Sequence, residues 1–139
     1  MLATVPFFHV YGMTVALNFP LAEGASIVKQ TRPDPDEILE LVRRYRPTEF
    51  PGVPALYQAL NQHPRIREYD LRSIRVCVSG SAALPLEVAR RFEALTGGHL
   101  IEGYGLTEAS PVTHANPIRG ERRQGWCPRR GQSLFSAIE

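Results

Sequence analysis

The chain contains one stretch whose side chains, taken together, could bind a nucleotide. Residues 103–108 read Gly-Tyr-Gly-Leu-Thr-Glu and follow the short apolar run Leu100-Ile101. The two glycines allow the backbone to turn tightly or to approach a ligand closely. The hydroxyl of Thr107 can donate a hydrogen bond to a phosphate oxygen, and the carboxylate of Glu108 is a hard ligand suited to Mg²⁺. These residues alone predict a nucleotide site and a plain glycine-rich turn about equally well.

Two further stretches have the residue types of a ligand site. Residues 6–12 read Pro-Phe-Phe-His-Val-Tyr-Gly, and the imidazole of His9 could hydrogen-bond a carboxylate or gate a passage by rotating. Residues 80–85 read Gly-Ser-Ala-Ala-Leu-Pro and join an alternating apolar run to a helical pattern. Open parallel sheets bind ligands at such strand-to-helix loops. Taken singly, His9 fits an ordinary loop or core histidine, and residues 80–85 fit an ordinary tight turn.

Together and in this order, the three stretches resemble motifs of the adenylate-forming (AMP-binding) superfamily, which includes acyl-CoA synthetases, luciferases and peptide-synthetase adenylation domains. The resemblance covers residues 1–120 and is strongest to a long-chain fatty acid or acyl-CoA synthetase. It implies that a carboxylate attacks the α-phosphate of ATP, which gives an acyl-adenylate and pyrophosphate. A thiol, usually coenzyme A, then takes the acyl group. The implied ligands are ATP or AMP, Mg²⁺, CoA and a carboxylic acid, with a fatty acid favoured over an amino acid.

The resemblance also implies roles for individual residues. His9 would lie beside the carboxylate, Thr107 would bind the α-phosphate, and Glu108 would hold the Mg²⁺ ion. Tyr104 would stack on the adenine, and Glu102 would reach the adenine edge. The implied nucleotide-binding set is Gly80, Ser81, Ala82, Glu102, Gly103, Tyr104, Gly105, Leu106 and Thr107. The implied acid-binding set is His9, Tyr11, Gly12, Val53 and Gly80.

Several parts of the family pattern do not occur in this sequence. The lysine-bearing phosphate loop that precedes the aromatic-histidine motif, the later ribose-binding aspartate and the C-terminal catalytic lysine have no counterpart, and Lys29 is the only lysine. We therefore expect a fragment, truncated at both ends, that forms no acyl-adenylate alone. Two alternatives stay open: a non-enzymatic α/β module that binds a nucleotide or a partner, and a non-functional gene fragment that aggregates.

Local patterns predict an α/β fold with a parallel, flavodoxin-like sheet. Helices are expected after the N-cap Asp34 with Glu37 completing a capping box, over residues 55–60, and from Pro85 to the stop at Gly97-Gly98. Strands are expected over residues 2–8, 25–28, 48–50, 73–79 and 100–101. Residues 14–19 are apolar on nearly all sides and predict a buried helix. The polar connector 61–70 is expected to leave His63 facing solvent.

Composition excludes some classes of function. The chain has 139 residues with a formal net charge of +2, which is too small to argue for nucleic-acid binding. Cys77 and Cys127 form neither a zinc motif nor a disulfide framework, so a reducing cytoplasm is expected. No apolar run approaches the ~20 residues that span a bilayer, which leaves a soluble protein or peripheral membrane association.

The end of the chain departs from the family pattern. Residues 1–120 are expected to form a partial AMP-binding domain, followed by a divergent tail over residues 121–139. This tail has no periodicity and pairs arginines at 122–123 and 129–130. A shift of the reading frame near Gly125 and a short divergent tail, either disordered or packed on the domain, are both open.

Overall fold

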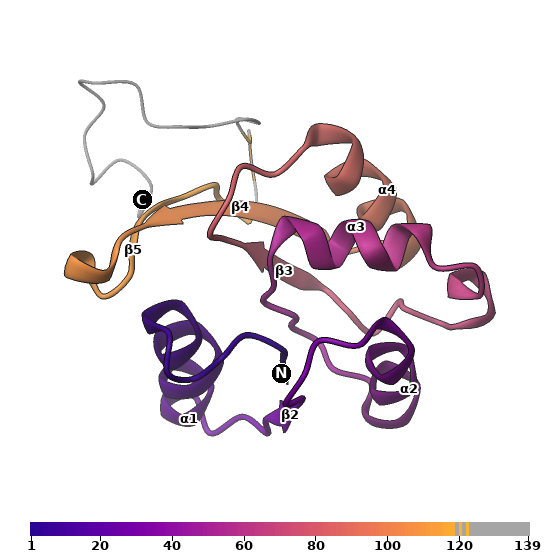
Figure 1. Cartoon of the computed structure of the whole chain (residues 1–139), viewed down its shortest axis with the longest axis horizontal. Coiled ribbons are helices and arrows are strands. Elements are labelled where there is room, and N and C mark those ends of the chain that lie inside the picture. Colours follow the sequence, from indigo (N-terminus) through magenta and orange to yellow (C-terminus); the bar gives the residue numbers. More distant parts are fainter. Residues whose placement is uncertain (119, 121, 123–139) are drawn as a thin grey trace.

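The computed structural model describes residues 1–118, 120 and 122, and it has the expected α/β architecture (Figure 1). The predicted tail, residues 121–139, lies outside the described residues apart from Arg122. None of the helices in the described part of the chain has the length and apolar character that crossing a membrane requires.

The strands form two hydrogen-bonded groups. β1 (Leu2–Ala3) pairs in parallel with β2 (Val28–Lys29), and β3 (Val76–Ser79) pairs in parallel with β4 (His99–Gly105). β5 (Val112–Ala115) pairs antiparallel with β4. The prediction of a parallel sheet therefore holds except at β5, which the sequence patterns missed.

An extended segment lies between the two sheets and forms backbone hydrogen bonds to both. Its Phe50 and Gly52 donate backbone hydrogen bonds to β3, and Glu49 O accepts one from Leu2 N of β1 at 2.9 Å. The strand expected at residues 48–50 is thus present only as isolated bridges. Pro51 explains the irregularity, because proline has no N–H to donate to a ladder.

Three helices carry most of the packing. They are α2 (Pro35–Tyr45), α3 (Pro54–Gln62) and α4 (Leu86–Thr96). The expected start of α2 is confirmed, since the Asp34 carboxylate accepts the Glu37 N–H at 3.1 Å. The capping box is not completed, because the Glu37 carboxylate accepts a hydrogen bond from Gln30 Nε2 instead. α4 ends as expected at Gly97, whose φ of +71° is readily adopted by glycine.

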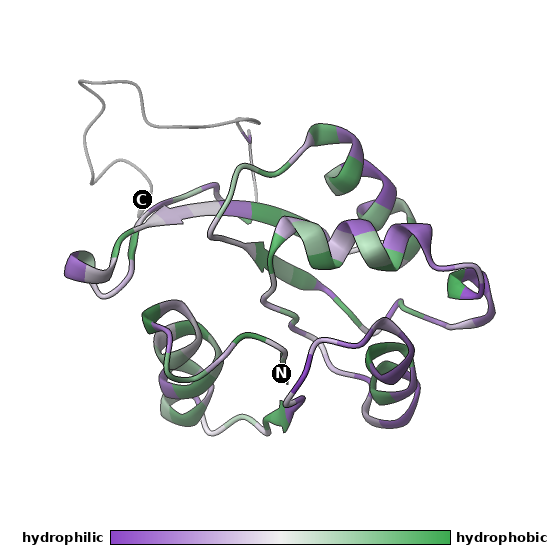
Figure 2. Cartoon of the chain, viewed as in Figure 1, coloured by the Kyte–Doolittle hydropathy of each residue, from purple (hydrophilic) through white to green (hydrophobic). Residues whose placement is uncertain are grey.

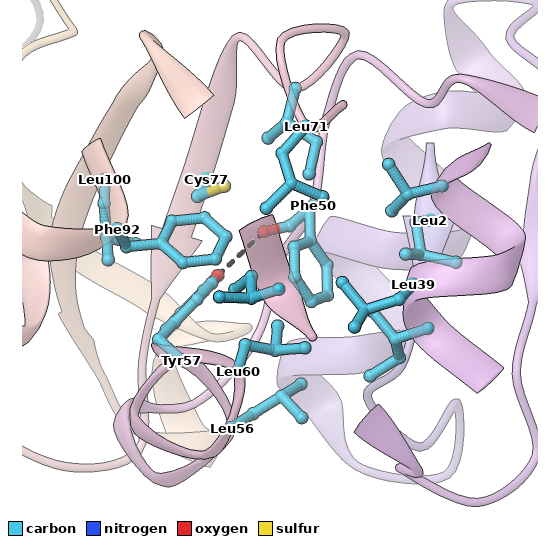
Figure 3. Close-up of a cluster of buried hydrophobic side chains, with 14 of the residues drawn as sticks. Leu2, Leu39, Phe50, Leu56, Tyr57, Leu60, Leu71, Cys77, Phe92 and Leu100 are labelled. Atoms are coloured by element: carbon cyan, nitrogen blue, oxygen red, sulfur yellow. Dashed lines mark hydrogen bonds between the residues drawn. The ribbon is translucent and has the colours of Figure 1, made fainter. Parts of the chain in front are cut away.

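The main core lies between one face of the sheet and these three helices (Figure 3). The rings of Phe50, Tyr57 and Phe92 meet edge-on or tilted, with centroids 5.0–6.3 Å apart. The Tyr57 hydroxyl donates to Phe50 O at 2.7 Å, which satisfies the one polar group on this ring. Figure 2 shows that green apolar and purple polar positions are mixed along these helices, whereas β3 is mostly green.

The other face of the sheet is covered by the N-terminal segment. A π-helical run, Gly12–Asn18, continues into α1 (Phe19–Ala22), and a second small core forms around Ala3, Tyr11 and Ala16. Residues 14–19 are helical as predicted, but the prediction that this helix is buried was wrong, because Phe19 is 49% exposed. Ala16 alone of this stretch is fully buried.

The connector between α3 and β3 also differs from expectation. It contains a single 3₁₀ turn, Ile66–Glu68. His63 does not face solvent: its side chain is only 10% exposed, and Nε2 lies 3.2 Å from the Asp36 carboxylate of α2. Side-chain contacts therefore hold the polar connector against α2. Local sequence patterns do not reveal such long-range contacts.

Candidate functional site

The three sequence stretches meet around one cavity of about 230 Å³. It lies beside the carboxyl ends of β3 and β4, where an open α/β sheet is expected to bind its ligand. The cavity is lined by His9, Val10, Tyr11, Val78, Gly80, Ser81, Gly103, Tyr104, Gly105, Leu106, Thr107, Pro111 and Val112.

The first wall is the loop that carries His9. Gly12 allows this loop to fold back, because a Cβ there would lie only 2.0 Å from Pro6 O. Tyr11 is buried, and its hydroxyl lies within hydrogen-bonding distance of both Val78 O (2.8 Å) and Gly52 O (3.3 Å), so the loop is fastened to the sheet. Burial raises the pKa of Tyr11, so this hydroxyl stays protonated as a donor.

The imidazole of His9 has a defined orientation. Its Nδ1 accepts the backbone N–H of Tyr11 at 3.2 Å. In the neutral ring the proton therefore sits on Nε2, which leaves Nε2–H as a donor. A donor of this kind on the cavity wall can hydrogen-bond an anionic oxygen.

The second wall is the loop between β3 and α4. Gly80 lies against the ring of Tyr11, where even a Cβ would be in ordinary contact at 3.5 Å. Ser81 has a φ of +72°, an unfavourable backbone conformation for a residue that is not glycine. Such strain is held in place only by the surrounding structure, and it is commonly found at ligand sites.

The third wall is the end of β4. The glycines at 103 and 105 form no turn; they continue the strand and pair with β5. A Cβ on Gly105 would lie 1.9 Å from Pro111 O, so only glycine allows the backbones of residues 105 and 111 to come this close. The ring of Tyr104 is 42% exposed and lies 6.3 Å from the ring of His114, a placement that leaves a flat aromatic face available.

Thr107 and Glu108 follow directly in a short 3₁₀ helix, Thr107–Ala109. Leu106 N donates to Pro111 O at 2.8 Å and closes this connection between β4 and β5. Thr107 lines the cavity, and its hydroxyl has no hydrogen-bond partner in the described part of the chain. Glu108 is exposed next to it and outside the lining residues.

A metal ion at this position would need ligands from a bound substrate. Residues 1–118, 120 and 122 contain no group of three or more His, Cys, Asp or Glu that could hold one. Mg²⁺ commonly uses one or two carboxylates together with substrate phosphates. The exposed carboxylate of Glu108, one residue from the cavity wall, fits that mode of binding.

Besides Glu108, four predicted site residues do not line the cavity. Gly12 is buried against the backbone of Pro6, Val53 packs against the main core, and Ala82 is exposed on the loop. Glu102 is buried, and its Oε1 accepts the Leu84 N–H at 3.0 Å.

Four lining residues were not identified from the sequence as part of a site: Val10, Val78, Pro111 and Val112. Strand alternation could have indicated Val78, since it places Val78 on the sheet face opposite Cys77. Val10 lies within the 6–12 stretch already singled out, whereas Pro111 and Val112 had no signal, because they depend on the fold of their loop.

The cavity wall carries no lysine or arginine in the described residues. The only lysine, Lys29, has its Nζ 4.8 Å from the centre of the Phe7 ring and donates to Gln30 O. Partial burial lowers the pKa of Lys29. The charge of a phosphate ligand would therefore be met here by neutral donors and by any bound cation.

Comparison with known proteins gives consistent matches. A long-chain-fatty-acid–CoA ligase of Bacillus subtilis is 51% identical over 129 residues, which cover 91% of this chain and 23% of that protein. A 4-coumarate–CoA ligase of Nicotiana tabacum is 38% identical over 113 residues, which cover 81% of this chain and 21% of that protein. The crystal structure of an anthranilate CoA ligase with anthranoyl-AMP superposes with a TM-score of 0.81 at 31% identity, covering 89% of this chain and 24% of that one.

The chain thus spans less than a quarter of the length of these curated relatives. The family model for AMP-binding enzymes matches residues 1–134, nearly the whole chain. The three stretches of the cavity wall lie inside this match, and the α/β fold agrees with that of adenylate-forming CoA ligases. The chain is therefore a member of the AMP-binding enzyme family.

Proposed function

We propose that this chain forms part of an acid–thiol ligase, in which it binds the adenylate of a carboxylic acid. The activity of such a ligase is the joining of an acid to CoA through an acyl-adenylate, at the expense of ATP. The observation that carries the proposal is the meeting of the His9 loop, the 80–85 loop and the end of β4 around one cavity.

The adenine would bind against Tyr104. Its partly exposed ring offers a flat surface for stacking, and the backbone of Gly103 and Gly80 leaves room on the cavity side. Ser81 would contact the nucleotide from the opposite loop. Each of these residues is small or planar, which suits a flat base.

The reacting groups would lie between His9 and Thr107. The Nε2–H of His9 would hold the acid's carboxylate, and the Thr107 hydroxyl would donate to the α-phosphate. Holding both groups in one orientation lowers the entropic part of the barrier. Glu108 would hold Mg²⁺, and that ion would neutralise charge on the phosphate oxygens.

For the acid we propose a fatty acid. The identity to the Bacillus fatty-acid ligase, 51%, exceeds the 38% to the coumarate ligase. Valine, leucine and proline side chains also make up part of the cavity wall. CoA as acceptor and a cytoplasmic location stay predictions that rest on the family.

We further propose that the 139-residue chain does not carry out adenylation by itself. The cavity wall has no lysine or arginine in the described residues, and the only lysine of the sequence, Lys29, has its Nζ against the Phe7 ring. The negative charge that develops during attack on ATP would be poorly stabilised. Pyrophosphate release from ATP and a fatty acid at ordinary enzyme rates would contradict this.

The test is calorimetric titration with a non-hydrolysable acyl-adenylate mimic. We expect saturable binding that falls roughly 5- to 150-fold in Tyr104→Ala, because base stacking is worth about 1–3 kcal/mol. Tyr45→Ala is a matched control, since Tyr45 is similarly exposed (49%) but lies at the end of α2. Equal losses in both variants, or no binding to the unmodified chain, would refute the proposed site.

The metal role has a separate test. Glu108→Gln should abolish the increase in mimic or ATP affinity that Mg²⁺ produces, while binding without Mg²⁺ stays the same. Glu87→Gln, an exposed carboxylate in the first turn of α4, is the matched control. If Mg²⁺ strengthens binding equally in Glu108→Gln, the ion is held elsewhere.

A further inference from the structure

A buried carboxylate holds the loop between β3 and α4 from behind. In the parallel ladder, Glu102 of β4 lies opposite Ser79, the last residue of β3. β3 leaves the sheet at this point, whereas β4 continues toward the cavity. The Glu102 side chain is 7% exposed, and its Oε1 accepts the Leu84 N–H at 3.0 Å.

Consecutive residues of β4 lie on opposite faces of the sheet. Gly103 lines the ligand cavity, whereas Glu102 lines a much smaller space of about 20 Å³ under α4, together with Leu84 and Ala89. This alternation follows from the pleat of a strand. The carboxylate is thus placed under the loop and away from the cavity.

The loop has few other backbone attachments, and its Leu84 side chain is buried in the main core. Gly80 N donates to Gly52 O at 3.2 Å, and the next backbone bond is the Leu84 N–H to Glu102. Within the described part of the chain, the N–H groups of residues 81–83 have no partner. The strained conformation of Ser81 lies between these two attachments.

We infer that Glu102 is a positioning residue, which fixes the conformation of residues 81–84 and so shapes the loop wall of the cavity. For its ligand this inference rests on the proposed function. It gives Glu102 a different role from direct contact with the adenine edge. A buried hydrogen bond to a charged acceptor is strong enough to hold such a loop.

The first test needs no ligand. Amide hydrogen exchange of the 139-residue chain should show Leu84 protected at least about tenfold relative to the amides of residues 81–83. Glu102→Gln keeps an acceptor oxygen and should keep this protection, whereas Glu102→Met keeps the volume without the acceptor and should lose it. Glu93→Met is the control for removing a second carboxylate that lines the same small space, because Glu93 accepts the Leu100 N–H of β4 at 2.8 Å and no amide of the loop.

Ligand binding gives the second test. With the acyl-adenylate mimic, Glu102→Met should bind at least about tenfold more weakly, while Glu102→Gln and Glu93→Met stay within about twofold of the unmodified chain. Tight binding by Glu102→Met with Leu84 unprotected would overturn the inference. If the unmodified chain binds no mimic, the proposed function fails. The exchange of the Leu84 amide then remains as the test of whether Glu102 holds the loop.

The unmodified chain decides the question if Glu102→Met does not fold. A Leu84 amide that exchanges as fast as those of residues 81–83 would then overturn the inference, and a slower one would support it. Rescue by glutamine separates the hydrogen bond from a general effect of removing the side chain.

Discussion

The two glycines of the 103–105 stretch differ in what they tolerate, which allows a sharp test of the structure. A Cβ on Gly105 would lie 1.9 Å from Pro111 O, 2.7 Å from Pro111 C and 3.1 Å from Val112 Cα. All three atoms are backbone, so they cannot rotate away. A Cβ on Gly103 would meet nothing closer than Val78 Cγ1 at 3.6 Å, an ordinary contact.

Gly105→Ala must therefore push β5 away from β4. The shift would break the Leu106 N–H to Pro111 O bond at 2.8 Å and disturb the bond from the Thr113 hydroxyl to Tyr104 O at 3.2 Å. Two hydrogen bonds at about 1 kcal/mol each, with a further 1–3 kcal/mol of overpacking, give a loss of roughly 3–5 kcal/mol. Gly103→Ala should instead be neutral or gain up to about 1 kcal/mol, because alanine has less chain entropy to lose.

Urea denaturation followed by circular dichroism measures both changes. We expect a much lower midpoint for Gly105→Ala and an unchanged or higher midpoint for Gly103→Ala. If Gly105→Ala unfolded within about 0.5 kcal/mol of the unmodified chain, the close approach of Gly105 and Pro111 would be refuted. If both alanine variants were equally unstable, the distinction between the two glycines would be wrong.

Three further predictions concern stability. Ser81→Gly should stabilise the fold by up to about 1 kcal/mol, because glycine relieves the cost of a φ of +72°; a lower urea midpoint would argue against strain there. Tyr57→Phe should lose about 1–3 kcal/mol, since Phe50 O loses the buried hydroxyl that donates to it at 2.7 Å; an unchanged midpoint would contradict this. The hydrogen bond from Arg65, with the charge of His63 adding to it, lowers the pKa of Asp36, so this carboxylate stabilises the fold above its unfolded pKa of about 4 and the stabilisation is lost as pH falls below it. Asp36→Asn should therefore reduce the loss of stability between pH 5 and pH 2, as measured by thermal melts. An unchanged dependence of stability on pH would exclude the Asp36 contribution.

Sequence patterns predicted those parts of the fold that depend on neighbouring residues. Asp34 and Gly97 mark the ends of helices because their caps use bonds within a few residues. Alternation in residues 73–79 likewise identified β3, since burial of one face leaves a period of two. The position of the 80–85 loop at the carboxyl end of this strand followed directly.

Features that depend on distant contacts were missed. β5 is only four residues long, and its place is set by pairing with β4 and by the backbone contact at Pro111. His63 belongs to a polar connector, yet its side chain is mostly buried and lies against the Asp36 carboxylate of α2. Neither contact leaves a periodic signal in the chain.

Several residues of the cavity could be identified from the sequence, but their arrangement around the cavity could not. His9, Tyr104 and Thr107 stand out by type and order, but their meeting depends on Tyr11, whose hydroxyl bonds the loop to Val78 of β3. The same ring supports Gly80, so one buried side chain fixes two walls at once. Loss of the Tyr11 hydroxyl alone would leave the ring in contact with Gly80, whereas loss of the ring would separate both loops. The order of the three stretches is thus a local property of the sequence, and the cavity is a property of the packing beneath them.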